Sequence, residues 1–269
     1  MECITSLTNH RVKDVVLYVG KAKERRRADV YVVEGTKMFM EAQTQELSEV
    51  FVSEQLLARA DEELLARIKQ LDGLPGVCVW QVTDEILRKM SDTQNPQGIL
   101  CVLKQKHYEL NELLQTENPL FVVLEDLQDP GNLGTILRTG EGAGITGVIL
   151  SKDSVDIYNP KTIRSTMGSI YRVPFVYVEN LEEVVHELGK RGIVTYAAHL
   201  KGEKTYDGFS YRKGCAFLIG NEGNGLREQT AALADHFLKI PMRGNVESLN
   251  AAIATAVLMY EAAKQRGFS

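Results

Sequence analysis

The stretch LFVVLEDLQDPGNLGTILRTGEGAGITGVIL, residues 120–150, decides the fold class. A short apolar run at 120–127 leads into a loop rich in Asp, Gly and Asn. A helical pattern then begins near Asn132, and a second apolar run follows at 147–150. Strand, helix and strand in this order are typical of a parallel sheet covered by helices. The stretch therefore predicts an α/β domain.

The same alternation continues to the end of the chain. Further apolar runs, separated by helical patterns, lie at 173–178, 193–198, 215–219 and 237–241. We expect them to complete a mostly parallel sheet with helices on both faces. A last helix is predicted over 248–266. Its apolar stripe consists of Leu249, Ile253, Ala256, Val257 and Tyr260.

The first third of the chain has a different pattern. A helix around Val12–Val19 is followed by an exposed turn that carries Lys21, Lys23, Arg25, Arg26 and Arg27. The remaining expected elements are strands at 30–35, 49–52 and 77–82 and helices at 56–71 and 84–90. Strands and helices mixed in this way indicate a small α+β domain.

The polar segment KQKHYELNELLQTEN, residues 104–118, has no sustained strand pattern and is interpreted as a linker with at most one helical turn. The predicted division is a domain at 1–104, a linker at 105–118 and a second domain at 119–269. A length of 269 residues with 44% hydrophobic residues is enough for two modest cores.

Composition excludes several classes of protein. The sequence has neither a signal-peptide pattern nor an apolar run near the roughly 20 residues of a membrane span, so we expect a cytoplasmic protein without membrane contact. The four cysteines (Cys3, Cys78, Cys101 and Cys215) form no C-x-x-C pair, which argues against disulfides and zinc. A net charge of -5 does not itself indicate a nucleic-acid binder, since phosphate binding depends on local cationic patches.

Chemistry in an open α/β sheet is expected in loops at the carboxyl ends of strands. The first such loop, residues 129–138, places Asn132, Gly134 and Arg138 at the start of a helix. The alternative for this loop is an Asn cap with a surface arginine.

A second loop, residues 217–226, leads from an apolar run into three glycines that let the backbone approach a ligand, with Glu222 as its one acid. The alternative is a plain turn with a solvated acid. The third loop, residues 240–254, leads into the last helix, for which Ser248 is a candidate N-cap.

Other chemistries have little support. The G-x-G-x-x-G match at 142–147 follows a helix and precedes a strand, which is the reverse of the order in dinucleotide binding. No G-x-S-x-G is present, and the five histidines are scattered. No histidine and carboxylate cluster has metal-ligand spacing, so no metal is expected.

Taken together and in this order, three motifs resemble those of the SpoU/TrmH family of RNA 2′-O-ribose methyltransferases. They are N-x-G-x-x-x-R at 132–138, G-N-E-G-x-G-L at 220–226 and I-P-M-x-G-x-V-x-S-L-N-x-x-x-A at 240–254. The resemblance covers about residues 119–266, with no departure at the motif positions. Residues 6–35 resemble the family's small substrate-binding domain, which is similar to a ribosomal protein fold.

The resemblance implies a SPOUT-type α/β domain whose C-terminal segment threads a loop to form a deep trefoil knot. Periodicity does not predict that knot, since knots are exceptions to ordinary chain topology. The family also implies a homodimer, with the first and last helices of the domain packed across the two-fold axis.

The resemblance further implies S-adenosylmethionine as methyl donor, bound in the knot. Its expected contacts are backbone groups of Gly220, Ile240 and Leu249, with Ala198 at a strand end and Ile219 and Met242 nearby. Backbone recognition explains why glycines and apolar residues mark such a site.

Arg138 is the expected catalytic residue, either as a clamp on the phosphate beside the target ribose or as the base for its 2′-hydroxyl. The clamp is chemically easier, since an arginine keeps its proton below a pH of about 12. Glu222 is expected to hold Arg138 or the ribose. Asn132, Ser248 and Asn250 are expected to supply hydrogen bonds that fix the arginine and the substrate.

The basic cluster of the N-terminal domain is the expected RNA-binding patch. Its members are Lys21, Lys23, Arg25, Arg26, Arg27 and Lys37. The alternative is a solvated charged turn.

The function expected from the resemblance is methylation of a ribose 2′-hydroxyl, with 23S-type rRNA as the favoured substrate. Alternatives within the superfamily are 2′-O-methylation of tRNA and methylation of an RNA base. An alternative of another class is a non-catalytic RNA-binding factor in ribosome assembly.

Overall fold

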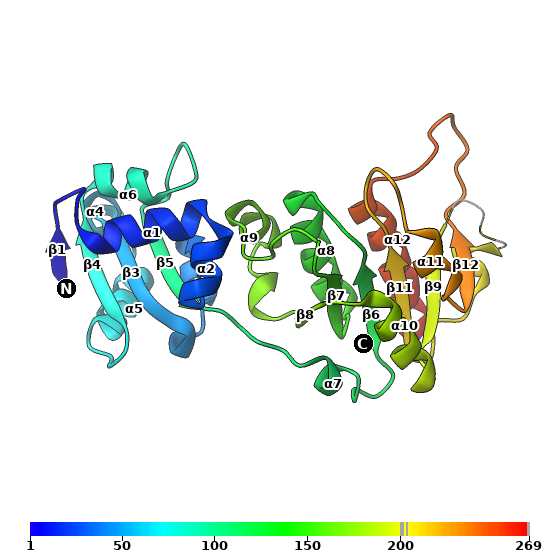
Figure 1. Cartoon of the computed structure of the whole chain (residues 1–269). Helices are drawn as coiled ribbons and strands as arrows, with labels where there is room; N and C mark the ends of the chain where they lie inside the picture. The colour runs from blue at the N-terminus through cyan, green and yellow to red at the C-terminus, as the bar shows by residue number, and fades with distance from the viewer. Residues whose placement is uncertain (200–201, 203, 268–269) are drawn as a thin grey trace. The chain divides into compact units, whose positions relative to one another are not determined.

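The computed structural model describes residues 1–199, 202 and 204–267, and the chain forms two compact units. The first unit contains Met1–Lys106 and Tyr158–Tyr171, and the second contains His107–Ile157 and Arg172–Ser269 (Figure 1). Each unit has its own sheet and its own core.

The first unit contains a five-stranded sheet in the order β1-β4-β3-β5-β2. The strands are β1 (Glu2–Ile4), β2 (Val30–Glu34), β3 (Leu47–Ser53), β4 (Cys78–Val82) and β5 (Ile99–Lys104). The helices are α1 (His10–Gly20), α2 (Ala22–Ala28), α3 (Thr36–Glu41), α4 (Glu54–Arg59), α5 (Glu62–Asp72), α6 (Asp84–Met90) and α9 (Pro160–Thr166). Short 3-10 helices are η1 (Thr44–Glu46) and η2 (Ser169–Tyr171). Strand β5 runs antiparallel to both of its neighbours, and the other pairs are parallel.

Helices α1 and α6 cover one face of this sheet. Val12 and Val15 of α1 are each 1% exposed and belong to one apolar cluster with Phe51 of β3 and Ile86 and Met90 of α6. Because the 3.6-residue period of each helix places its apolar residues on one side, both helices bury a single stripe against the strands.

The segment predicted as an exposed basic turn is a helix, α2. Its sequence AKERRRA consists of good helix formers. The helix ends at Asp29, which adopts a left-handed conformation with φ of 56°. Among the cations of this helix, Arg25 is buried. The turn prediction was wrong because five cations suggested solvent exposure, although charge does not prevent a helix from forming.

The helix predicted over 56–71 is two helices, α4 and α5. The break lies at Ala60–Asp61, where Oδ1 of Asp61 accepts a hydrogen bond of 2.9 Å from the backbone of Leu64 and so begins a new helix. Strands β1 and β5 were not predicted. Strand β5 lies between two partners, and five of its six residues are buried.

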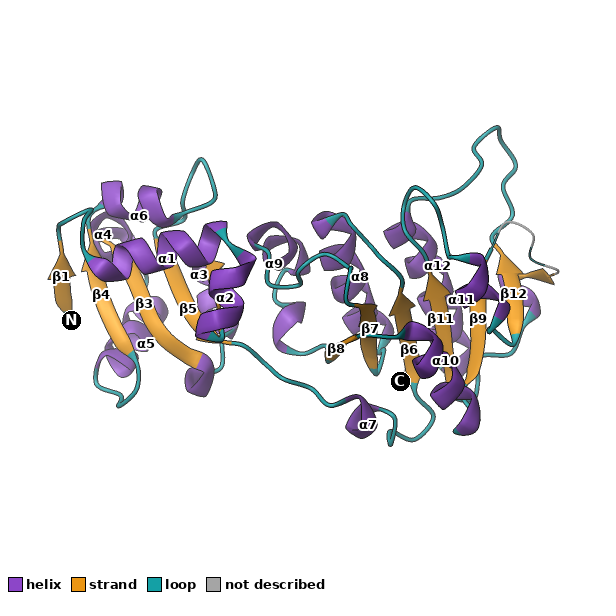
Figure 2. Ribbon diagram, viewed as in Figure 1, coloured by secondary structure: helices purple, strands orange, loops and turns teal. Residues whose placement is uncertain are grey.

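The second unit contains a seven-stranded sheet in the order β10-β12-β9-β11-β6-β7-β8 (Figure 2). The strands are β6 (Leu120–Leu124), β7 (Gly147–Ser151), β8 (Phe175–Val178), β9 (Val194–Ala198), β10 (Lys204–Thr205), β11 (Cys215–Ile219) and β12 (His236–Lys239). The helices are α7 (Leu110–Leu113), α8 (Pro130–Ala143), α10 (Leu181–Lys190), α11 (Glu228–Ala232), α12 (Ala251–Arg266) and the 3-10 helix η3 (Tyr206–Gly208). All of its strand pairs are parallel, which confirms the predicted α/β class.

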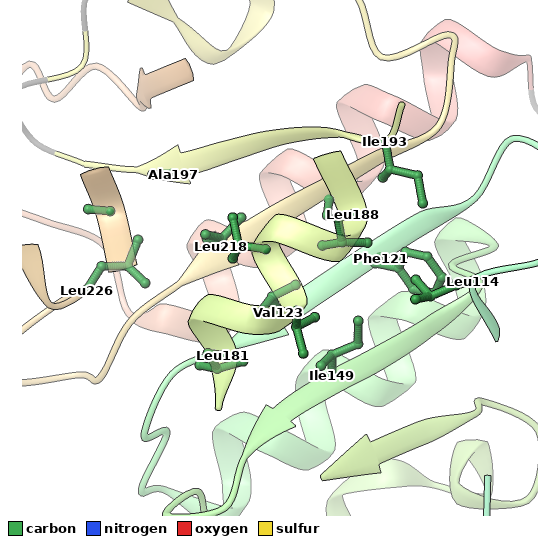
Figure 3. Packing of buried hydrophobic residues seen from close by; sticks show 14 residues of the cluster. Leu114, Phe121, Val123, Ile149, Leu181, Leu188, Ile193, Ala197, Leu218 and Leu226 are labelled. Carbon is green, nitrogen blue, oxygen red and sulfur yellow. The ribbon is translucent and has the colours of Figure 1, made fainter. Parts of the chain in front are cut away.

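Helix α10 packs on one face of this sheet. Leu181 and Leu188 contact a cluster that includes Val123 of β6 and Leu218 of β11 (Figure 3). Complete burial of one leucine contributes roughly 2 kcal/mol. The central strands β6 and β11 are buried on both faces, so their sequences read as continuous apolar runs. The predicted run 215–219 coincides with β11, whereas β6 ends at Leu124, before the end of the predicted run 120–127.

Helix α12 packs on α8 and β11 through a face of small and medium side chains. The buried residues of this face are Ala252, Thr255, Leu258, Met259, Ala262 and Ala263. The stripe predicted from the sequence lies elsewhere on the helix, and Ile253 and Tyr260 are 50% and 44% exposed. Helix α12 is therefore apolar on more than one side, and the described residues leave Ile253 and Tyr260 about half exposed.

Residues 158–171 form an excursion from the second unit. The flanking strands β7 and β8 belong to the second unit, but residues 158–171 pack with the first unit. The ring centroids of Tyr158 and Tyr31 are 4.5 Å apart, and the Tyr171 hydroxyl donates a hydrogen bond of 2.9 Å to the carbonyl of Met38. The linear boundaries drawn from the sequence did not anticipate this excursion. The expected single helical turn in the linker is α7. In residues 1–199, 202 and 204–267, no helix is long and apolar enough to cross a bilayer.

Candidate active site

The three motif loops lie at the carboxyl ends of neighbouring parallel strands. Residues 125–132 follow β6, residues 220–227 follow β11 and residues 240–250 follow β12. Strands β12, β9, β11 and β6 are consecutive in the sheet and run in the same direction, so their loops leave from one edge. Each of the three loops therefore follows the carboxyl end of a strand, and the strand order brings them to the same edge of the sheet.

One residue of each motif takes part in a single chain of hydrogen bonds. Asn132 Nδ2 donates to Glu222 Oε1 at 2.9 Å, and Asn250 Nδ2 donates to Asn132 Oδ1 at 2.9 Å. Asn250 Oδ1 accepts from the backbone N–H groups of Ala252 and Ile253 at the start of α12. We call this set of contacts, Glu222–Asn132–Asn250, the amide relay.

The direction of the amide relay is fixed by its two ends. Since Asn250 Oδ1 faces backbone N–H groups, only its NH2 group is left to donate to Asn132. Asn132 then accepts through its oxygen and donates through its nitrogen to the carboxylate of Glu222. Each amide orientation is therefore determined by its partners, as an assignment of amide groups requires.

Glu222 also accepts hydrogen bonds from two backbone N–H groups that precede α8. The N–H of Gln128 lies 3.1 Å from Oε2, and the N–H of Asp129 lies 3.0 Å from Oε1. Partial burial raises the pKa of Glu222. The hydrogen bonds from Asn132, Gln128 and Asp129 lower it by a larger amount, so the net pKa is below the usual value. Glu222 is consequently an anion at neutral pH and a weak base.

The partner of Glu222 differs from the sequence expectation. The carboxylate of Glu222 lies at the N-terminal end of α8, where the helix dipole favours negative charge. It forms no hydrogen bond or ion pair with Arg138 in the described part of the chain. Arg138 is exposed on α8, and in the described part of the chain its guanidinium has no hydrogen-bond or ion-pair partner. Its charge is therefore available to a ligand.

A residue that the sequence analysis missed anchors the second loop. Glu125 follows β6 directly, is 1% exposed, and accepts from the Arg227 backbone N–H at 2.7 Å and from Arg227 Nε at 2.8 Å. The hydroxyl of Thr230 donates to the same carboxylate. These bonds hold the end of loop 220–227 and the start of α11 against β6. The signal in the sequence was the position of this acid directly after a buried strand. A carboxylate at such a position is expected to be buried and therefore to need hydrogen-bond or ion-pair partners.

The body of loop 220–227 folds back on itself. Asn221 Nδ2 donates to the Asp126 carbonyl at 2.7 Å, and its Oδ1 accepts from the Gly223 N–H at 2.8 Å. A Cβ atom on Gly220 would lie 2.0 Å from the carbonyl carbon of Gly225, so only glycine fits at position 220. The glycine that was expected to admit a ligand is required by the loop's own backbone.

The third loop is open to solvent. Val246 is 63% exposed, and no backbone group of residues 241–249 forms a hydrogen bond within the described chain. Ser248 is exposed and forms no side-chain hydrogen bond there. Its candidacy as N-cap is wrong: α12 begins at Ala251, and Asn250 is the cap because its side-chain oxygen reaches the first N–H groups of the helix.

The residues expected at a cofactor site surround this edge of the sheet. Ala198 ends β9 and Ile219 ends β11, and Gly220 and Ile240 follow β11 and β12. Met242 and Leu249 lie in the open third loop and are partly buried. Within the described residues, the backbone groups of Met242 and Leu249 form no hydrogen bond.

The basic cluster of the first unit is only partly a surface feature. Arg25 is 3% exposed, and its guanidinium donates to the carbonyls of Tyr18 and Val19 at the end of α1. The structure thus makes Arg25 a bridge between two helices and removes it from the expected RNA-binding patch. Lys21, Lys23 and Arg26 are exposed, Arg27 pairs with Glu24 at 2.7 Å, and Lys37 lies 3.7 Å from Glu41.

Comparisons with known proteins agree with this geometry. The SpoU rRNA Methylase family matches residues 119–260, and the MRM3-like substrate binding domain matches residues 9–101. The chain is 30% identical over 260 residues to the 23S rRNA (guanosine(2553)-2'-O)-methyltransferase RlmP of Bacillus subtilis, covering 97% of this chain and 98% of that protein. It is 32% identical over 245 residues to RlmB of Vibrio parahaemolyticus, a 23S rRNA (guanosine-2'-O-)-methyltransferase, covering 88% and 96%.

Solved structures give the same result. An AdoMet-bound rRNA methyltransferase from Sinorhizobium meliloti superposes with a TM-score of 0.86 at 30% identity, covering 98% of this chain and 97% of that one. The SpoU methyltransferase AviRb from Streptomyces viridochromogenes, in complex with AdoMet, gives 0.85 at 26% identity, covering 96% and 98%. With the three motif loops joined at one edge of its parallel sheet, the chain belongs to the SpoU family of RNA methyltransferases.

Proposed function

We propose that this protein transfers a methyl group from S-adenosylmethionine to a ribose 2′-hydroxyl of 23S-type rRNA. The observation that carries the proposal is the amide relay, which joins the three family motifs at one edge of the sheet. The relatives RlmP and RlmB are named for this reaction on guanosine in 23S rRNA, and both cover nearly the whole chain.

The residues at the strand ends fit an adenosyl group. Gly220, Ile240 and Leu249 offer backbone groups, and the partly buried Ala198 and Met242 offer apolar surface near the buried Ile219, which matches the polar edge and apolar face of an adenine. When bound, S-adenosylmethionine supplies an electrophilic methyl group on a sulfonium. Neighbours solved with AdoMet have the same fold, which supports this cofactor.

Arg138 is assigned to the RNA. Its exposed guanidinium has no partner among the described residues, and the planar, positively charged fork suits a phosphate, so it can clamp the phosphate next to the target ribose and orient the 2′-hydroxyl. Glu222 is a weak base because its carboxylate already accepts three hydrogen bonds. Its role is to orient Asn132, and the relay extends that orientation to Asn250. Ser248, exposed in the third loop, is assigned to hydrogen bonding with substrate.

We also propose that the protein is a homodimer formed through α12. Ile253 and Tyr260 are half exposed on this helix, and Ala256 and Val257 lie on the same stripe and are partly buried. A second copy that covers the stripe would remove this apolar surface from water. We further propose that the C-terminal segment forms the family's trefoil knot and that the protein is cytoplasmic. The proposed domain division is a substrate-binding domain at 1–104, a linker at 105–118 and a methyltransferase domain at 119–269.

RNA binding is assigned to the first unit, which matches a substrate-binding domain. The cations proposed to contact phosphates are Lys21, Lys23, Arg26, Arg27 and Lys37. The ion pairs of Arg27 and Lys37 are solvent-exposed pairs worth at most about 1 kcal/mol, so they do not prevent phosphate binding.

The test is transfer of radiolabelled methyl from S-adenosylmethionine to unmodified total RNA, followed by size separation and digestion to nucleosides. A labelled 2′-O-methylnucleoside in the large ribosomal RNA is the expected result. Label in the tRNA fraction would change the substrate, and label on a base would change the reaction. Cofactor binding without any transfer, to free RNA or to ribosomal particles, would indicate a non-catalytic assembly factor.

A further inference from the structure

A hollow of about 490 Å³ lies in the first unit. It is bordered by the start of α3, the junction of α4 and α5, and the loop of residues 91–98 that follows α6. The residues that matter for its chemistry are Thr36, Leu56, Arg59, Asp61, Pro96 and Gln97. None of them was singled out by the sequence.

The loop that forms one wall of the hollow is held at both ends. At its start, the hydroxyls of Ser91 and Thr93 donate to the carboxylate of Glu34 at 2.5 and 2.7 Å. At its end, the carbonyl of Gly98 accepts from the Ser53 N–H at 2.8 Å. Gly98 has φ of 93°, and a Cβ atom there would lie 2.7 Å from Cβ of Leu56. The wall is thus preorganised, which lowers the entropy cost of binding a ligand.

The polar groups of the hollow are free to bind. In the described chain, the guanidinium of Arg59 and the amide of Gln97 are exposed and form no hydrogen bond or ion pair. Asp61 uses Oδ1 to cap α5, which leaves Oδ2 as an acceptor. Leu56 and Leu64 are 6% and 3% exposed and form an apolar floor. Donors and an acceptor above an apolar floor suit a planar ring with a polar edge.

The acid in the hollow selects the kind of ligand. A phosphate would meet the carboxylate of Asp61 as well as the guanidinium of Arg59, so one charge would oppose the other. A nucleobase avoids this conflict because its edge presents N–H donors and acceptors together. Guanine fits best, since its N7 and O6 match an arginine fork and its N1–H and N2–H groups match a carboxylate.

We propose that this hollow binds one unpaired guanine nucleotide of the RNA substrate, outside the nucleotide that is methylated. Arg59 and Asp61 would contact the base edge, with Gln97 at its side and Pro96 and Leu56 against its face. Unpaired bases are the parts of RNA that proteins read in this way. The inference rests on the proposed function for the identity of the substrate as RNA.

The first test measures binding of the full-length protein to an unmodified 23S rRNA transcript at several salt concentrations. The variants are Arg59→Ala, Arg59→Lys and Gln97→Ala, with Lys69→Ala as the control that removes an exposed cation from α5. We expect Arg59→Ala to weaken binding about 5- to 150-fold, with an unchanged salt dependence, because a base contact releases no counterions. Arg59→Lys should bind more weakly than the parent and more tightly than Arg59→Ala, because an ammonium can donate to guanine N7 and O6 without the arginine fork, and Lys69→Ala should bind nearly as the parent does.

Equal losses in Arg59→Ala and Lys69→Ala would overturn the proposal. So would a salt slope reduced by about one in Arg59→Ala, since that result identifies a phosphate contact. In methyl-transfer assays we expect a raised KM for RNA with an unchanged kcat. Binding is measured without transfer, so an inactive protein that still shows the Arg59 effect would refute the proposed reaction and leave the guanine site intact.

The second test uses nucleosides directly. Saturation-transfer NMR on the full chain, with excess S-adenosylhomocysteine to fill the cofactor site, should show contact with guanosine that is lost in Arg59→Ala. Uridine should give a much weaker signal. Equal signals from guanosine and uridine, or a guanosine signal unaffected by Arg59→Ala, would refute the assignment.

Discussion

Replacement of Asn250 separates two roles that the structure places on one side chain. Its Oδ1 caps α12 through Ala252 and Ile253, and its Nδ2 donates to Asn132 at 2.9 Å. Loss of an N-cap costs about 1 kcal/mol, and loss of one exposed hydrogen bond costs about 0.5–1 kcal/mol. Asn250→Ala should therefore lower the free energy of unfolding by about 1.5–2 kcal/mol.

In a domain of this size, that loss corresponds to a decrease in Tm of about 3–8 °C, measurable by circular dichroism. Ser248→Ala is the matched control for stability, because Ser248 forms no side-chain hydrogen bond within the described chain. We expect its Tm to be unchanged.

Asn250→Ser distinguishes the cap from the relay. Serine is an equally good N-cap, so the free energy of unfolding should fall only by the lost relay hydrogen bond, about 0.5–1 kcal/mol, which is less than in Asn250→Ala. Its short side chain carries no amide donor, so Asn132 loses the contact that fixes its orientation. Methyl transfer should fall about 10- to 100-fold, as expected for a displaced positioning group. Full activity in Asn250→Ser would refute a positioning role for the relay, and an unchanged Tm in Asn250→Ala would refute the cap.

Three further predictions concern single residues. Arg138→Ala should abolish transfer and leave S-adenosylmethionine affinity by calorimetry nearly unchanged, and loss of both would show that Arg138 was misassigned. Ile253→Glu should convert a dimer to a monomer in light scattering, whereas Leu7→Glu, which alters an apolar residue 40% exposed in the other unit, should not; a dimer in both variants would exclude this helix face. The lowered pKa of Glu222 means that its stabilisation is present above the usual pKa of 4.5 and is lost as pH falls through its folded value. Glu222→Gln should therefore reduce the decrease in the free energy of unfolding as pH falls below 4.5. The same decrease in the parent protein and in Glu222→Gln would contradict the assigned hydrogen bonds.

Much of the second unit could be predicted from the sequence because its central strands are buried on both faces. Residues 215–219 form an uninterrupted apolar run, and the predicted and observed strands coincide. The first unit was harder to predict. Strand β5 was missed although it lies between two partners, and the basic segment 21–27 was interpreted as a turn although it forms a helix. The strands that pair with β5 are distant from it in sequence. In the basic segment, Arg25 bonds to backbone carbonyls of α1, which composition does not reveal.

The site shows the same division. The motif residues Asn132, Glu222 and Asn250 could be chosen from the sequence, but their contacts span about 90 and 118 positions along the chain. No local pattern encodes which of them touch. Glu125 was missed for a related reason, since a carboxylate is expected at the surface unless its partners are known.

The sequence by itself determined the parallel α/β class, the positions of the three motif loops and the family to which they belong. These features depend on apolar periodicity and on residue identity, which are local properties. Only the tertiary structure decided that Asn250 rather than Ser248 caps the last helix, that Glu222 holds the start of α8 rather than Arg138, and that Ile253 and Tyr260 of α12 remain half exposed. Each of these outcomes depends on which groups the fold brings within hydrogen-bonding or packing distance, and that proximity is a property of the folded chain.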